Sequence, residues 1–162
     1  MRRLTLALVL LTGCDRPTTV AKQPTGGAAL EQAARERGLV AAATAPSGVF
    51  QTDTDRVCLS PGPQGVTIGA SVDYGEGQRC VARGRAVLQG EQTLMVDFGG
   101  DCRFDARLEA ERLVFPPVLP EACAAACVGR ASLSAITAAR LSDAPAEAAR
   151  TRGADGSLLC PG

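Results

Sequence analysis

The chain has 162 residues and a balanced charge, with 17 Lys and Arg against 17 Asp and Glu. This length fits one domain with tails, and the balanced charge gives no sign of the basic surface that nucleic acid requires. The sequence contains no histidine, which excludes Ser-His-Asp and Cys-His catalysis and every His-ligated metal. We therefore expect a protein that is not an enzyme and that uses no cofactor, metal or nucleic acid.

The first fifteen residues are arranged like a secretory signal. Arg2 and Arg3 precede an apolar run at 4–11, which is far shorter than the ~20 residues of a membrane-spanning helix. The sequence Leu11-Thr12-Gly13-Cys14 follows and resembles the lipobox of bacterial lipoproteins. The resemblance implies a signal peptide at 1–13, cleavage before Cys14, and acyl chains such as palmitate on Cys14. Several acyl chains hold a protein stably on a membrane.

Two alternatives stay open for this segment. Small residues before Cys14 also fit an ordinary cleaved signal with an incidental cysteine. Asp15 resembles the inner-membrane retention signal of enteric bacteria. That sorting rule varies among bacteria, so the choice between inner and outer membrane stays undecided. The expected location is the cell envelope, with a lipid anchor and the protein facing the periplasm.

Residues 14–47 are expected to form a tether. The segment 15–28 is rich in Pro, Thr and Gly and poor in apolar side chains, a composition typical of a flexible spacer. Helix formers, a Glu31/Arg35 pair and the stop at Gly38 predict a short helix over 29–38. A second spacer at 41–47 leads to the next domain.

Residues 48–141 show the alternation of half-buried antiparallel strands. Apolar residues occupy every second position in three long segments: Val66, Ile68, Ala70, Val72 and Tyr74; Cys80, Ala82, Gly84, Ala86 and Leu88; and Cys102, Phe104, Ala106 and Leu108. Further strands are expected at 48–51, 56–59, 94–98 and 112–115. Gly-rich turns separate units of about 12 residues, a spacing that predicts a mainly β meander closed as a small barrel or rolled sandwich.

The C-terminal part mixes signals. Residues 120–127 have a helical composition, and 131–141 fit either a helix or a strand. We favour a closing strand for 131–141, because an open sheet edge would otherwise need covering. The tail, 142–162, is expected to be helical from 144 to 152, with Asp143 as cap and Gly153 as stop.

Six cysteines remain beside Cys14, and they predict three disulfides in an oxidising compartment. They are Cys58, Cys80, Cys102, Cys123, Cys127 and Cys160. Cys123 and Cys127 lie one helical turn apart, so each is expected to bond a separate segment. Of the fifteen pairings we favour Cys58–Cys80, Cys102–Cys123 and Cys127–Cys160. The alternative, a metal or redox centre, lacks a C-x-x-C or a second matching pair.

Candidate binding residues lie on the predicted outer strand faces. Arg79, Arg83, Arg85, Arg103 and Arg107 would form a stripe if their strands are neighbours. With Ser71 and Tyr74, the last four arginines form a candidate face for an envelope protein or an anionic envelope component. The alternative is a mixed, solvated face, because acidic residues are interleaved. The carboxylate pairs Asp53/Asp55 and Asp101/Asp105 are expected to be solvated rather than catalytic.

The sequence Ser71-Val72-Asp73-Tyr74, followed by a turn and a strand, resembles a motif of membrane-bound inhibitors of C-type lysozyme. Those proteins are also lipoproteins with small, disulfide-bearing β-barrels. The chain lacks the family's aromatic-rich strand and its lysine, for which Arg83 or Arg85 would have to substitute. The favoured function is a non-enzymatic binding or structural module of the envelope, with a periplasmic inhibitor of lysozyme-type enzymes as the alternative.

Overall fold

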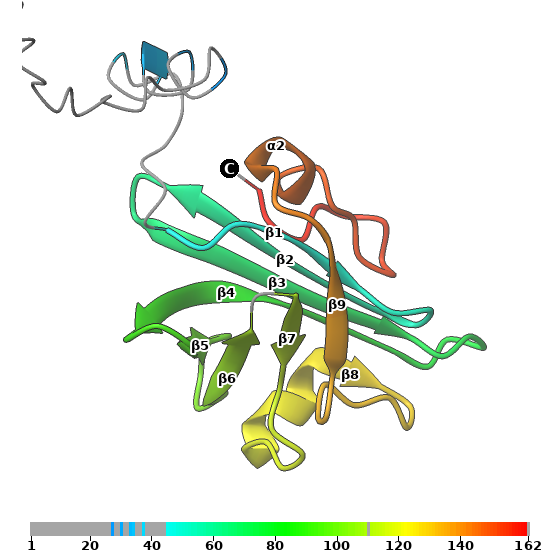
Figure 1. The fold of residues 1–162 in the computed structure, drawn as a ribbon. Helices are drawn as coiled ribbons and strands as arrows, with labels where there is room; N and C mark the ends of the chain where they lie inside the picture. Colours follow the sequence, from blue (N-terminus) through cyan, green and yellow to red (C-terminus); the bar gives the residue numbers. More distant parts are fainter. Residues whose placement is uncertain are drawn as a thin grey trace, which may run out of the picture. The chain divides into compact units, whose positions relative to one another are not determined.

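Eight strands hydrogen-bond in a closed antiparallel ring (Figure 1), which confirms the predicted meander barrel. The computed structural model describes residues 45–109 and 111–161, together with Gly27, Leu30, Ala33, Ala34 and Arg37. The ring contains β1 (Gly48–Gln51), β2 (Asp55–Gly62), β3 (Gly65–Asp73), β4 (Arg79–Gln89), β5 (Thr93–Asp97), β6 (Arg103–Glu109), β7 (Arg112–Val114) and β9 (Thr137–Ser142). Each strand pairs with its neighbours in order, and β9 pairs with β1 to close the ring.

The predicted inward faces fill the barrel interior. An eight-stranded barrel is just wide enough for side chains to pack across it. The largest buried side chains of the described residues are those of Phe50, Phe115, Leu59, Ile68, Leu94, Leu113, Leu133, Ile136, Leu159, Val57, Val72 and Val96. All except Leu159 belong to the core inside the ring. The predicted alternation on β3, β4 and β6 is therefore correct, except that Tyr74 is 51% exposed in the turn after β3.

An insertion between β7 and β9 covers one end of the barrel. It contains the 3-10 helix η1 (Glu121–Ala126), the short strand β8 (Cys127–Val128) and an irregular segment that buries Leu133 and Ile136 in the core. β8 pairs with the start of β4. Figure 1 shows this insertion below the ring, at the end opposite to the start of β1. We refer to residues 116–136 as the cap.

The C-terminal tail, residues 143–161, packs on the outside of the barrel. Its helix α2 (Pro145–Ala148) contacts β1 and β2. Leu159 and Cys160 are fully buried in a second, smaller apolar cluster with Val49 and Cys58. Outward side chains of the first strands are therefore covered by the tail rather than by solvent.

Each of the three disulfides joins the barrel to either the cap or the tail. Cys102–Cys123 and Cys80–Cys127 fasten the cap to the barrel, and Cys58–Cys160 fastens the tail to β2. The predicted Cys102–Cys123 bond is confirmed, but the predicted Cys58–Cys80 and Cys127–Cys160 bonds are wrong. Cys58 points outward under the tail while Cys80 is in the inner core, so the barrel wall separates them.

Other local predictions need smaller corrections. Residues 137–142 form the closing strand, while 131–136 belong to the cap. The expected helix over 144–152 is a single turn, and its N-cap is Ala144 without a side-chain bond, so Asp143 is not its cap. The helical composition at 120–127 gives the 3-10 helix η1.

The predicted tether is described at only a few positions. Leu30, Ala33 and Ala34 are helical, and the Arg37 N–H donates to the Ala33 carbonyl at 3.3 Å. The predictions for residues 1–26, the Glu31/Arg35 pair and the second spacer up to residue 44 lie outside the described residues. Among the residues that the structure describes, no helix is long and apolar enough to cross a membrane.

The contact between Gly69 and the tail gives a stability prediction. A Cβ on Gly69 would lie 2.5 Å from the Leu159 carbonyl oxygen, so Gly69→Ala should push the tail outward. We expect a loss of about 1–3 kcal/mol in the free energy of unfolding, measured by urea denaturation. Gly62→Ala is the control, because its Cβ would meet nothing closer than 3.6 Å. Equal stability of the two variants would contradict the packing described.

Candidate binding face

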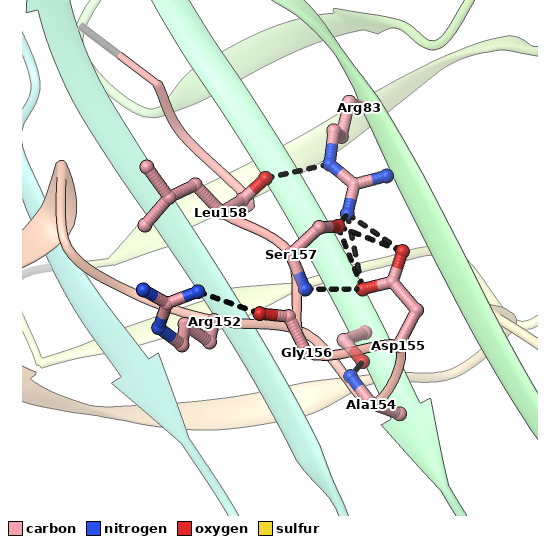
Figure 2. Close-up of polar contacts among 8 residues, drawn as sticks. Arg83, Arg152, Ala154, Asp155, Gly156, Ser157 and Leu158 are labelled. Carbon is pink, nitrogen blue, oxygen red and sulfur yellow. Dashed lines mark hydrogen bonds and ion pairs between the residues drawn. The ribbon is translucent and has the colours of Figure 1, made fainter.

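The tail covers part of the predicted binding face. Arg83 of β4 is tied to it (Figure 2): its Nε donates to the Leu158 carbonyl at 2.7 Å, and its Nη2 lies 2.9 Å from Asp155 Oδ2. Nη2 also bonds the Ser157 hydroxyl. The Ser71 hydroxyl accepts the Ala154 N–H at 2.9 Å, and Ser71 is only 4% exposed. Arg83 and Ser71 therefore hold the tail.

The ion pair between Arg83 and Asp155 has a clear electrostatic signature. The hydrogen bond from the Arg83 guanidinium, followed by that from the Ser157 hydroxyl, lowers the pKa of Asp155 from 3.8 to about 2. Both side chains remain about one third exposed, so solvent and salt weaken the pair. Its role is to position the tail over β3 and β4.

The outer surface of β5, β6 and the part of β4 from Arg85 onward lies beyond the tail's contacts with Val81 and Arg83. We call this surface the open face; its outward side chains are Arg85, Val87, Gln89, Thr93, Met95, Asp97, Arg103, Asp105 and Arg107. Strand register places them in rows across the sheet. One row contains Arg85, Asp97 and Arg103. The other two are Val87–Met95–Asp105 and Gln89–Thr93–Arg107.

The arginines of the open face differ in their partners. Arg103 Nε donates to Asp97 Oδ2 at 2.8 Å. The Gly99 N–H, followed by the Arg103 guanidinium, lowers the pKa of Asp97. Arg85 Nη2 donates to the Gln64 side-chain oxygen at 2.7 Å. Arg107 has no side-chain hydrogen bond or ion pair with any described residue, which leaves it available to an anionic ligand.

A surface hollow of about 480 Å³ lies beside Arg107, where β6 and the chain after β7 separate. The β6–β7 ladder ends at the Arg107–Val114 pair, whereas β6 continues to pair with β5 as far as Arg103. The residues that line the hollow are Thr93, Asp105, Ala106, Arg107 and 114–117. We call this hollow the slot.

Beneath the slot, aromatic rings close the barrel. The Phe104 and Phe115 ring centroids are 4.9 Å apart in an edge-on contact, and Phe98 lies 5.9 Å from Phe104. The Phe115 N–H donates to Ile136 rather than to β6. The wall is therefore held by ring packing at this point, and the edge of β6 at Arg103–Ala106 has no strand partner on the β7 side.

The two pairs of candidate carboxylates lie in different parts of the described chain. Asp53, Asp55 and Asp73 line a hollow of about 390 Å³ between the β1–β2 turn and the tail, together with Arg56 and Arg152. Within the described ranges, no group of three or more acidic or cysteine side chains is placed to hold a metal.

Asp101 precedes β6, whereas Asp105 lies on the strand itself. Asp101 lies in the turn before β6, where its carbonyl accepts the Arg103 N–H at 3.1 Å. Asp105 is on β6 and lines the slot. The geometry gives neither residue a catalytic partner among the hydrogen bonds of the described chain.

The six candidate binding residues thus lie in three places. Arg85, Arg103 and Arg107 share the open face, Ser71 and Arg83 lie under the tail, and Tyr74 is in the β3–β4 turn. Sequence reasoning missed the role of Asp155, which lies 72 residues from Arg83. It also missed Asp97, although alternation along β5 and β6 would have placed Asp97 beside Arg103.

Comparison with protein-family profiles, with curated proteins and with solved structures found no match to the chain. The assignment of a site therefore rests on the geometry described above.

The tail's ion pair predicts a pH dependence. Asp155 has a lowered pKa in the folded state, so its stabilising effect is complete above about pH 4 and is lost as the pH falls through about 2. Asp155→Asn should therefore reduce stability at neutral pH but make little difference near pH 2. Urea denaturation of both proteins across this range measures the gap, and Arg83→Gln should reduce the same pH dependence, because the hydrogen bonds from Ser157 remain. A gap that is independent of pH would exclude this role for Asp155.

Proposed function

We propose that the chain is a lipid-anchored protein of the bacterial cell envelope and that Cys14 carries the lipid. The lipobox-like residues 11–14 support the anchor. A second support is that the six other cysteines bond one another in pairs. This pairing leaves none of them as a partner for Cys14, and three disulfides fit an oxidising compartment such as the periplasm.

We propose that the barrel is a non-enzymatic binding module that uses the open face. The observation that carries this proposal is the contrast between the two sides of the barrel. Arg83 is bound to the tail, whereas Arg107 lies at a hollow without a side-chain partner among the described residues. An anionic envelope component or an acidic surface of an envelope protein is the chemistry that such a face would bind.

The alternative function, inhibition of lysozyme-type enzymes, gains no support from the site. The motif that carries the resemblance begins at Ser71, and Ser71 is buried and bonded to Ala154. A turbidity assay with added lysozyme tests this alternative directly. Stoichiometric inhibition would favour it over the binding module.

The anchor is tested by Cys14→Ser. We expect the unaltered protein to sediment with membranes and to incorporate labelled palmitate, because two or more acyl chains give stable attachment. The variant should lose the label and fractionate as a soluble protein. Cys102→Ala/Cys123→Ala is the matched control, since it removes cysteines that the structure pairs with each other. Membrane attachment of Cys14→Ser would refute the anchor.

The open face is tested by Arg85→Gln/Arg107→Gln in the full chain. We expect the double variant to cosediment less with phosphatidylglycerol vesicles or isolated peptidoglycan, by about tenfold in affinity, because two cationic contacts are lost. Arg130→Gln in the cap is the control, because it removes one exposed cation from another surface. Equal binding by all three proteins, or binding by none of them, would exclude these anionic envelope components as ligands of the open face.

A further inference from the structure

The slot is open at one end and closed at the other. Its closed end is the Arg107–Val114 pair, where the β6–β7 ladder begins. From there the edge of β6 runs back toward Arg103, while the chain turns away through Phe115 and Pro116. An extended segment that enters the slot alongside β6 must therefore end beside Arg107.

The backbone of β6 offers hydrogen bonds in the slot. The Leu108 N–H donates to the Gln92 carbonyl at 2.8 Å, so the backbone N–H of Leu108 points to the β5 side of β6. Alternate residues of a strand point their N–H and C=O groups to opposite sides. Those of Asp105 therefore point into the slot, where the ladder with β7 is absent.

The opposite bank cannot supply the missing partners. Pro116 and Pro117 have no N–H group, and the Pro116 carbonyl accepts the Ala135 N–H at 3.0 Å. An occupant would therefore pair with β6 alone. Its alternate side chains would face the side of the slot lined by Ala106 and Phe115, two apolar residues that are themselves buried.

Arg107 decides which end of the occupant lies at the closed end. It has no acidic partner among the described residues, whereas Arg103 is paired with Asp97 and Arg112 with Glu109. At the closed end an N-terminal ammonium would meet the like charge of Arg107, and a C-terminal carboxylate would meet the opposite charge. The carboxylate of Asp105, which also lines the slot, belongs to a residue two positions nearer the open end. Charge-assisted hydrogen bonds between guanidinium and carboxylate are among the strongest in proteins.

We propose that the slot binds the free C-terminal segment of a partner polypeptide, added as a strand parallel to β6 with its terminal carboxylate on Arg107. Recognition by strand addition and by capture of a terminal carboxylate are both established modes of peptide binding. The inference rests on the proposed binding face and specifies its ligand.

The test uses acetylated six-residue peptides of alternating Thr and Val, in both phases, each with a free C-terminus or a C-terminal amide. The full chain carrying Cys14→Ser is titrated and binding is followed by calorimetry and by amide NMR shifts. The free acid should bind about tenfold more tightly than its amide. The shifts should centre on Asp105, Ala106 and Arg107.

Two pairs of variants separate charge from backbone pairing. Arg107→Gln should bind acid and amide equally, whereas Arg130→Gln should keep the preference for the acid. Asp105→Pro removes the N–H in the slot and should weaken both peptides, while Asp105→Thr keeps this N–H and should not. Peptides that are N-methylated at alternate residues lack the N–H groups that would donate to β6. They test the same hydrogen bonds with Asp105 left unchanged in the protein.

Three results would overturn the inference: no binding at millimolar peptide, equal binding of acid and amide, or NMR shifts confined to residues outside the slot. If vesicle or peptidoglycan binding still depends on Arg85 and Arg107 in that case, only the peptide slot fails. If the peptides bind as expected and the anionic probes do not, the ligand of the open face is a polypeptide alone.

Discussion

The pairing of β1 with β9 is the constraint on which the rest of the structure depends. These two strands are the first and last of the ring, and their register shifts between Val49 and Phe50. At this junction the Arg140 guanidinium lies 4.6 Å from the centre of the Phe50 ring and donates to the Ser47 carbonyl. Closure pairs each strand of the ring on both sides over at least part of its length, which limits the unpaired edge to short segments such as the slot. Closure also brings the end of β9 to the start of β1, from where the tail can cross β1 and β2.

The disulfides stabilise segments that the barrel itself cannot hold. The ring's core contains few large aromatic side chains, since the whole chain has four Phe, one Tyr and no Trp. In the chain-entropy account, a cross-link stabilises more as the loop it closes grows longer. Cys58–Cys160 spans 102 residues and Cys102–Cys123 spans 21, which corresponds to about 4.7 and 3.3 kcal/mol. The largest contribution therefore falls on the tail, whose own helix is a single turn.

The sequence predicted the barrel well because its strands alternate and its turns are short. Alternation placed Ile68, Ala82 and Ala106 inside correctly, and neighbouring strands in a meander pair by default. The same local reasoning could not predict the tail. The contacts of Gly69 with Leu159 and of Arg83 with Asp155 join residues more than 70 positions apart. No periodic pattern encodes such contacts.

The candidate binding residues divide in the same way, into those placed by strand register and those covered by the tail. Residues placed by strand register, such as Arg85, Arg103 and Arg107, share a face as predicted. Arg83 and Ser71 lie on the same strand faces by periodicity, but the tail covers them. A covered polar side chain must be hydrogen-bonded because burying it unpaired is costly, and the tail's backbone and Asp155 supply those bonds. Predicting the loss of these two residues from the binding face would have required the Cys58–Cys160 pairing.

The residues that hold the tail on the barrel lie apart from those proposed to bind a ligand. The tail and Cys58–Cys160 hold the side of the barrel at β1–β4, while the open face has side chains that pack little against the core. Surface substitutions of this kind usually change stability by about 0.5 kcal/mol or less. The slot shows the same separation. Phe104 and Phe115 close the barrel wall beneath the edge of β6 that has no strand partner. Changes at Asp105 or Arg107 therefore test the recognition proposed for the slot while the aromatic contact and the ring of strands remain in place.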